Sequence, residues 1–217
     1  MEPRLIKLSG PSLEVLRSRV LAEHGEHARL LEANRVTVGG VAGFLARRHY
    51  EVTVQLPPPP VPLSAPGSLV LVAGLGEDAV EVCASMAAAA GYGAELLRAA
   101  GLASAPGIAR ADDRREAERA QAEAVLGGRP VYVAMGLPGE TLRNSLGAAA
   151  AAALGPDQVW AAVDAGRKAD DTAQWVAALQ DAVHVDAVAL FGLDGTSSPG
   201  TAAALGIPVG WTDGPLP

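Results

Sequence analysis

The chain is poor in several residue types, and each scarcity excludes a class of protein. Only one of its 217 residues is a cysteine, Cys83, which excludes an internal disulfide framework and a cysteine-based zinc site and fits a reducing, cytoplasmic environment. Aromatic residues make up only 4%, so the core has to be built from Ala, Val and Leu. Basic residues are also fewer than acidic ones, 17 against 24. The net charge of −7 argues against a nucleic-acid-binding protein, because phosphate contacts need a basic surface.

Long apolar runs are also missing. Residues 1–10 contain none, so we expect no secretory signal. The alanine run GAAAAAALG at residues 147–155 is too short to span a bilayer, so we expect no membrane span. Hydrophobic residues nevertheless make up 49% of the chain, which is enough for a packed core and excludes wholesale disorder.

A proline-rich segment divides the chain. The sequence QLPPPPVPLSAPGS at residues 55–68 holds six prolines between Pro57 and Pro66. Proline fixes φ and lacks an N–H, which predicts an extended, semi-rigid spacer. We therefore expect a small domain at residues 1–56, a linker at 57–67 and a larger domain at 68–217.

The small domain has a strand–helix–strand–strand pattern. Residues 5–8, 28–38 and 50–56 have strand composition, and Pro11 is expected to open a helix that carries Leu13, Leu16 and Val20 on one face. A core built from about 56 residues is marginal. We expect this domain to rely on a partner surface or on a second copy of the chain.

The larger domain alternates strand and helix patterns. Strands are expected at residues 69–73, 94–97, 131–135, 159–163, 187–191 and 208–211, and helices at 79–90, 112–126, 140–154, 170–179 and 200–205. This alternation predicts an α/β fold, a parallel sheet with helices on both faces. Such sheets bind ligands beyond the carboxyl ends of their strands.

A glycine turn follows the first of these strands, in LVAGLGEDAVEVC at residues 71–83. A Walker loop starting at Gly74 would need a lysine and a hydroxyl where the chain has Val80 and Glu81. The cation and the Mg²⁺ ligand are therefore absent. Glu77 and Asp78 fall at the expected helix start, where they would repel a triphosphate.

The same turn also fits the dinucleotide pattern G-x-G-x-x-A, with Gly74, Gly76 and Ala79. That pattern further requires an acid at the end of the next strand. Glu95 lies at the right spacing, but near the start of its strand. Two interpretations remain open: a dinucleotide site, or glycines that only turn the chain.

The other candidate residues have plainer explanations. We interpret Asp170 and Asp171 as the first turn and cap of a helix, and His24 and His27 as a solvated helix end. The hydroxyls at 196–198 are expected to cap the next helix, Cys83 to be a small core residue, and residues 110–124 to form a solvated helix face. We therefore expect no catalytic residue, no metal site and no cofactor.

The N-terminal segment resembles the first domain of FlhF, the flagellar GTPase of the signal-recognition-particle class. The matching features are Glu23, Gly25 and Ala28 in the helix-to-strand step, then 39–40 and 43–44 in a glycine turn, then EVTV at 51–54. The resemblance covers residues 5–56.

The C-terminal part, roughly residues 156–214, resembles the same family's guanine-recognition strand and loop. In FGLDGT, Asp194 stands where the family's aspartate reads the guanine edge, and Gly192 stands in place of its lysine. The resemblance implies a vestigial nucleotide site made of Gly74, Gly76, Asp194, Gly195 and Thr196. The family's DTAG switch has no copy here; the nearest segment is MGLPG at 135–139.

The motifs that form the fold are thus kept and those that carry hydrolysis are lost. The resemblance implies a pseudo-GTPase, a cytoplasmic regulator or scaffold that binds a protein partner or forms a homodimer and serves the localisation or assembly of a surface apparatus. The alternative is a nucleotide-binding or dinucleotide-binding protein, of the GTP or NAD class, that uses the Gly74–Gly76 loop. An arginine folded over that loop (Arg98, Arg110 or Arg167) would favour the alternative.

Overall fold

The computed structural model describes residues 4–24, 28–38, 47–56, 61–139, 141–196, 202 and 204–213. The chain forms two compact units, Met1–Pro59 and Pro60–Pro217, here called the N-terminal and C-terminal units. Their boundary falls inside the proline-rich segment.

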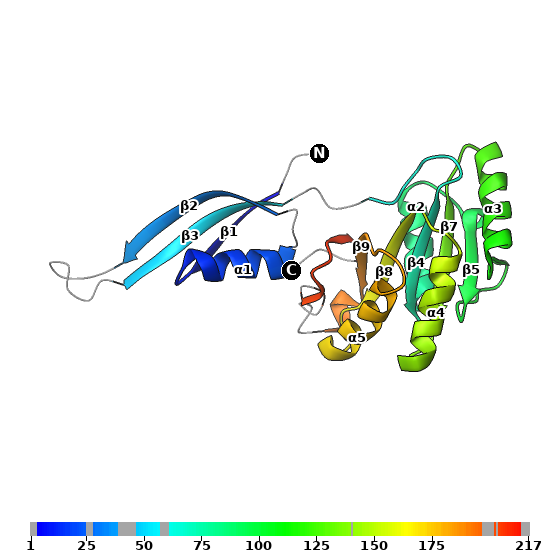
Figure 1. Ribbon diagram of the computed structural model, residues 1–217. Coiled ribbons are helices and arrows are strands. Elements are labelled where there is room, and N and C mark those ends of the chain that lie inside the picture. The colour runs from blue at the N-terminus through cyan, green and yellow to red at the C-terminus, as the bar shows by residue number, and fades with distance from the viewer. Residues whose placement is uncertain are drawn as a thin grey trace. The chain divides into compact units, whose positions relative to one another are not determined.

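The N-terminal unit is a three-stranded antiparallel sheet with one helix on one of its faces (Figure 1). Its elements are β1 (Arg4–Gly10), α1 (Leu13–His24), β2 (Arg29–Val38) and β3 (Arg47–Leu56), and the strand order is β1-β3-β2. Leu16 and Val20 of α1 pack on Val52 and Val54 of β3 to form a small buried core.

Helix α1 begins two residues later than the sequence predicts. The expected start is Pro11, but the first helical residue is Leu13. The Ser12 hydroxyl oxygen accepts a hydrogen bond from the backbone N–H of Val15 at 3.2 Å, as a serine that caps a helix does. This cap fixes the start of α1 after the proline.

The C-terminal unit is built on a seven-stranded parallel sheet in the order β10-β9-β8-β4-β7-β5-β6. The strands are β4 (Leu69–Leu75), β5 (Leu97–Gly101), β6 (Ala109–Arg110), β7 (Val131–Leu137), β8 (Gln158–Asp164), β9 (Ala187–Phe191) and β10 (Val209–Thr212). The helices are α2 (Asp78–Ala89), α3 (Arg114–Leu126), α4 (Thr141–Ala153) and α5 (Ala169–Gln180), with short 3₁₀ helices η1 (Ala94–Leu96) and η2 (Leu193–Gly195).

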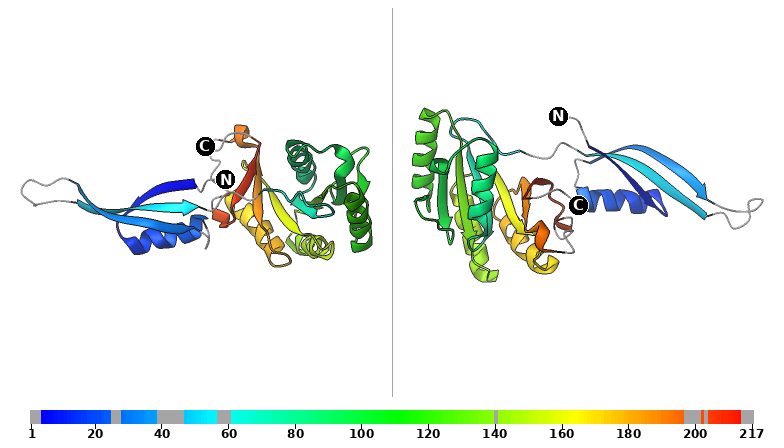
Figure 2. Two further views of the ribbon diagram at one scale, coloured as in Figure 1. Left: turned by 90° about the horizontal axis from the view of Figure 1, so that it is seen from above. Right: turned by 180° about the vertical axis from the view of Figure 1, so that it is seen from behind.

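Helices cover both faces of this sheet. Helix α2 packs on one face, and α3, α4 and α5 pack on the other; the view from behind in Figure 2 brings α2 to the front. Right-handed crossovers dictate this division, because the chain runs one way along the sheet from β4 to β5 and the opposite way from β6 to β10. The predicted parallel α/β arrangement is confirmed.

The core consists of small aliphatic residues, as the composition implies. Strand β4 is buried on both faces: Leu69 and Leu71 face the three-helix side, and Val70 and Val72 face α2. The helices that follow β4 and β8 lie on opposite faces although these strands are neighbours. Sheets of this kind bind ligands at such a reversal, beyond the carboxyl ends of the strands.

The second predicted strand is misplaced. Residues 94–96 form η1, and β5 begins only at Leu97. Leu96 and Leu97 are both buried, so the leucine pair does not mark the strand's start. The two-residue β6 was not predicted. Of the helix expected at 200–205, residues 202, 204 and 205 are described and have 3₁₀ conformation.

Part of the predicted spacer is not free. The buried amide of Gln158 accepts the N–H of Leu63 and donates to the carbonyl of Val61, both at 3.0 Å. The Trp160 indole N–H donates to the same amide oxygen at 2.9 Å. Residues 61–63 are therefore held against β8, and the linker bounds of 57 to 67 stay a prediction.

We expect Gln158→Leu to lower the free energy of unfolding of the C-terminal unit by about 2 kcal/mol, because the buried Trp160 N–H loses its partner. Tryptophan fluorescence during urea unfolding reports on this unit, since Trp160, Trp175 and Trp211 all lie in it. The exposed Gln180→Leu is the control, with an expected change within about 0.5 kcal/mol. Equal stability of the two variants would contradict this role.

Candidate functional site

The turn between β4 and α2 is very short. Strand β4 ends at Leu75 and α2 begins at Asp78, so only Gly76 and Glu77 lie between them. Gly76 has φ +60°, a left-handed conformation that favours glycine, and its N–H donates to the Leu137 carbonyl at 2.8 Å. A Walker loop keeps four residues between its glycines and points N–H groups at phosphate. This turn is too short to form a Walker loop, and the Gly76 N–H is already hydrogen-bonded within the protein.

Two further glycines, Gly74 and Gly136, allow neighbouring segments to pack closely around the turn and so seal it. A Cβ on Gly74 would lie 3.2 Å from both the Ala162 Cβ and the Ala79 backbone nitrogen. A Cβ on Gly136, in β7, would overlap the Gly76 carbonyl oxygen and the Ala103 nitrogen. Both glycines therefore allow backbones to approach closely, which is a packing role.

Acidic side chains surround the start of α2. Asp78 and Glu81 lie in its first turn, and Glu77 occupies the N-cap position without a side-chain capping bond. Arg167, which follows β8, reaches Asp78 with Nη2 to Oδ2 at 3.5 Å. Asp164 ends β8, and its Oδ1 accepts the Gly166 N–H at 2.8 Å.

The balance of these interactions raises the pKa of Asp78. Burial is the largest cause, and the neighbouring carboxylates of Asp164 and Glu81 add to it, while Arg167 opposes it. The arginine therefore only partly offsets the cost of a carboxylate at this position. A phosphate brought here would meet further negative charge.

The predicted guanine-reading segment lies on the same edge of the sheet, after β9. Asp194 and Gly195 belong to η2 and are exposed, and Thr196 follows them half-buried. Gly192 has φ +71°, and a Cβ there would lie 3.0 Å from the Asp164 Oδ1. A lysine at position 192 would be strained in this left-handed conformation.

The five predicted site residues fall into two groups. Gly74 and Gly76 belong to β4 and its turn, and Asp194, Gly195 and Thr196 follow β9; β8 runs between these strands. The predicted nucleotide contacts of these residues stay a prediction.

Sequence reasoning missed three residues on this edge: Gly136, Asp164 and Asp213. Asp213 accepts the Gly192 N–H at 2.7 Å. Asp164 and Asp213 each directly follow or end an apolar strand, which is a signal that the sequence offered. The role of Gly136 depends on atoms from the turn after β4 and from the segment after β5, so no local sequence pattern indicates it.

Of the three arginines whose position over the loop would favour the alternative, only Arg167 reaches it. Arg98 donates to the carbonyls of Glu95 and Leu97 and pairs with Glu123 at 3.1 Å. Its guanidinium is thus held at the amino end of β5, away from the turn.

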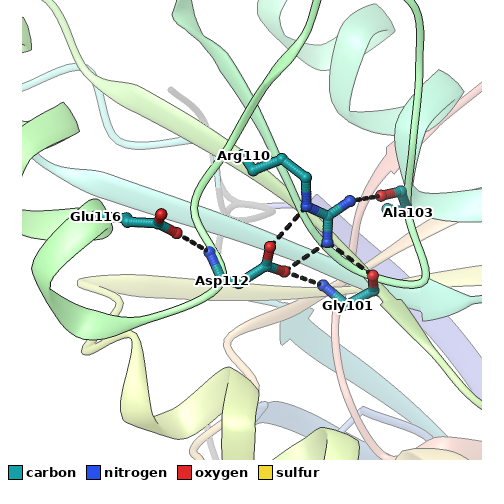
Figure 3. A network of polar contacts seen from close by, with 5 residues as sticks. All are labelled: Gly101, Ala103, Arg110, Asp112 and Glu116. Atoms are coloured by element: carbon teal, nitrogen blue, oxygen red, sulfur yellow. Dashed lines mark hydrogen bonds and ion pairs between the residues drawn. The ribbon is translucent and has the colours of Figure 1, made fainter.

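Arg110 is held in a separate network at the carboxyl end of β5 (Figure 3). It binds both carboxylate oxygens of Asp112 and donates to the Gly101 and Ala103 carbonyls at 2.8 Å. Asp112 accepts the Gly101 N–H, and Glu116 accepts the Asp112 N–H. The hydrogen bond between the two side chains lowers the pKa of Asp112 and raises that of Arg110.

This network bears on the dinucleotide interpretation. Glu95 lies in η1, before β5, and pairs with Arg129 at 3.2 Å, so it is not at the strand end where a ribose would bind. The acid at that end is Asp112, and Arg110 already occupies both of its oxygens. The second requirement of the fingerprint is not met in this arrangement.

The remaining candidates are structural. Asp170 and Asp171 lie in the first turn of α5 as predicted, but the cap is Lys168, without a side-chain bond. Cys83 lies on the buried face of α2 and is fully buried, and burial raises its pKa. His27, Ser197, Ser198 and the side chain of His24 lie outside the described residues. Within the described part of the chain, no group of three or more His, Cys, Asp or Glu is placed to hold a metal ion.

The predicted solvated face of α3 is present, with Arg114 and Glu118 paired at 2.8 Å on its exposed side. Among the described helices, none combines the length and apolarity needed to cross a bilayer.

No protein-family model matches the chain, and no curated protein matches it. Solved structures similar to it include the signal recognition particle receptor FtsY from Elizabethkingia anophelis, with a TM-score of 0.47 and 15% identity over 67% of this chain and 57% of that one. The same receptor in complex with GDP has a TM-score of 0.46 and 15% identity over 67% of this chain and 55% of that one. The chain therefore spans little more than half the length of these receptors.

We expect Gly136→Ala to destabilise the C-terminal unit by about 3 kcal/mol, because the added methyl group has to push two backbone segments apart. Gly139→Ala is the matched control: a Cβ there meets no atom within 4 Å, and we expect a change within about 0.5 kcal/mol. Urea unfolding followed by tryptophan fluorescence gives both values. Similar losses from the two alanines would contradict the sealing role.

The raised pKa of Asp78 predicts a pH-dependent effect of Asp78→Asn. A carboxyl with a raised native pKa favours the folded state below its ordinary pKa, and this contribution is lost as the pH rises through the native value. The asparagine variant should therefore be more stable than the wild type at about pH 7, with an advantage that fades near pH 3. Thermal unfolding across this range measures the difference, and an advantage that grows toward low pH would contradict the sign.

Proposed function

We propose that the chain is a non-catalytic pseudo-GTPase that binds no nucleotide and acts through contacts with another protein. The observation that carries the proposal is the sealed turn: the Gly76 N–H donates to the Leu137 carbonyl, and only two residues separate β4 from α2. Nucleotide binding would require this turn to open against the backbone packed on Gly136.

The chemistry at the lost Walker positions supports the same conclusion. Val80 is partly buried and packs against the core beneath α2, so its position is used for packing. Glu81 is exposed in the first turn and adds negative charge. The nearby Arg167 is paired with Asp78 and is not available to replace the lysine without breaking that pair.

The biological role follows from the resemblance to the flagellar GTPase family. A chain that keeps the family's fold-forming motifs and lacks its hydrolytic ones suits a cytoplasmic regulator or scaffold that takes part in the localisation or assembly of a surface apparatus. Its partner would be another protein or a second copy of the chain.

One observation favours the alternative, a nucleotide-binding protein. The guanidinium of Arg167 does reach the β4–α2 turn, where an arginine would neutralise phosphate. In that case Asp78 blocks the site by pairing with Arg167, and a nucleotide would compete with Asp78 for this arginine.

Thermal unfolding with millimolar GTP, GDP, ATP or NAD and Mg²⁺ tests both candidates. A ligand at about 100 times its dissociation constant stabilises the folded state by about 2.7 kcal/mol, or several degrees. We expect no shift for the wild type and none for Asp78→Asn or its control Asp170→Asn, each compared with its own ligand-free sample.

A shift in the wild type would overturn the proposed function. A nucleotide-dependent rise in melting temperature confined to Asp78→Asn would show that the Asp78 carboxylate blocks an intact nucleotide site, and would favour the alternative. Asp170→Asn separates this from the general effect of removing one acid from the first turn of a helix.

A further inference from the structure

The N-terminal unit has one helix for three strands. A helix with its side chains is about 10 Å wide, and neighbouring strands lie about 4.8 Å apart, so one helix covers about two strands. Helix α1 packs on β1 and β3, and the β2–β3 hairpin projects beyond it (Figures 1 and 2). The face of β2 on the α1 side is therefore left uncovered.

Register identifies the side chains on that face. Leu30 pairs with Val54, Ala33 with Val52 and Arg35 with Tyr50. Directly paired residues share a face, and these β3 residues pack toward α1. Leu30 is 43% exposed, and Ala33 and Arg35 are exposed as well, so together they form an open surface here called the β2 inner face.

The β2 inner face is apolar and basic. Among the described side chains of the three strands, Arg35 is the only charged one on the α1 side. The acids Glu32 and Glu51 lie on the opposite face, where Glu51 pairs with His49 at 3.3 Å. The exposed surface of α1 adds Leu21, which is 55% exposed, together with both Arg17 and Glu14, so it is apolar with mixed charge. A partner for this surface needs an apolar stripe flanked by negative charge.

The distribution of charged residues between the two units also favours an anionic partner for the N-terminal unit. The N-terminal unit holds eight basic and six acidic residues, whereas the C-terminal unit holds nine and 18. The small unit is thus the basic part of an acidic protein, and its basic side chains favour an anionic partner.

We propose that the β2 inner face, together with the exposed side of α1, binds an acidic amphipathic helix of another protein. This inference rests on the proposed function as a partner-binding chain, and it names the chemistry of the partner. The bound helix would lie beside α1 at the usual 8–10 Å spacing of packed helices and complete the cover of the sheet.

Pairing of two copies through the β2 edge fits the structure less well. A register irregularity between Leu30 and Glu32 interrupts the strand, and the exposed Arg29 and Arg35 are charged; both are devices that keep edge strands apart. Helix α1 of a second copy carries acids and arginines together, so it offers no net negative charge to the β2 inner face.

Two labelled helical peptides test the proposal on the full chain by fluorescence anisotropy. Both carry the same leucine stripe; one has glutamate and the other lysine at the flanking positions. We expect the glutamate peptide to bind at least about tenfold more tightly, and Ala33→Glu or Arg35→Glu to weaken it by about tenfold or more. Raising the salt concentration should weaken it as well.

The controls are matched for strand and charge. Asn34→Glu and Arg29→Glu make the same changes on the opposite face of β2, and we expect less than about a twofold effect from either. Circular dichroism and thermal unfolding establish that all four variants are folded.

Equal affinity for both peptides would overturn the proposal, and so would an equal loss of affinity from the substitutions on the two faces of β2. So would a dimer that Ala33→Glu dissociates, or binding to anionic lipid vesicles without a preference between the peptides. Absence of peptide binding together with absence of a nucleotide shift would refute this inference and leave the proposed function standing. A nucleotide shift would instead remove the proposed function.

Discussion

The closed turn at the candidate site depends on two facing glycines at the carboxyl edge of the parallel sheet. Gly74 of β4 and Gly136 of β7 are register partners, and the lack of a Cβ at each lets neighbouring backbone pack directly against them. That approach brings the Gly76 carbonyl and the Ala103 nitrogen onto Gly136 and holds the Gly76 N–H on the Leu137 carbonyl. A turn closed in this way can be only two residues long, and it has no N–H groups arranged around a phosphate.

The charges around the turn are consistent with that closure. With no phosphate to neutralise, the start of α2 carries acids, which suit the positive end of the helix dipole. Arg167 pairs with Asp78, and the left-handed Gly192 lies beside Asp164. Glycines that resemble a nucleotide motif can therefore serve packing alone. We propose that partner binding falls to the N-terminal unit, whose sheet is only partly covered.

The sequence predicts the order of the elements well and their close contacts poorly. Apolar runs such as those of β7 and β8 mark strands buried on both faces, and these were placed within two residues. Strand β5 was misplaced because alanine and leucine give little contrast between a strand and the 3₁₀ turn before it. The identity of the candidate edge was predictable from topology, and so was the acidity around Asp78. The role of Gly136 and the pairing of Arg167 depend on segments far apart in the sequence, which no local pattern specifies.

The Gly76 N–H is bonded to the Leu137 carbonyl, so it is not free to bind a ligand. Amide NMR of the full chain tests it most directly, by hydrogen exchange and by titration with GDP and Mg²⁺. We expect a Gly76 N–H that is strongly protected from exchange and whose chemical shift does not move at millimolar GDP. A Gly76 amide that exchanges as fast as in an unstructured peptide, or one that shifts in a saturable way with GDP, would contradict it.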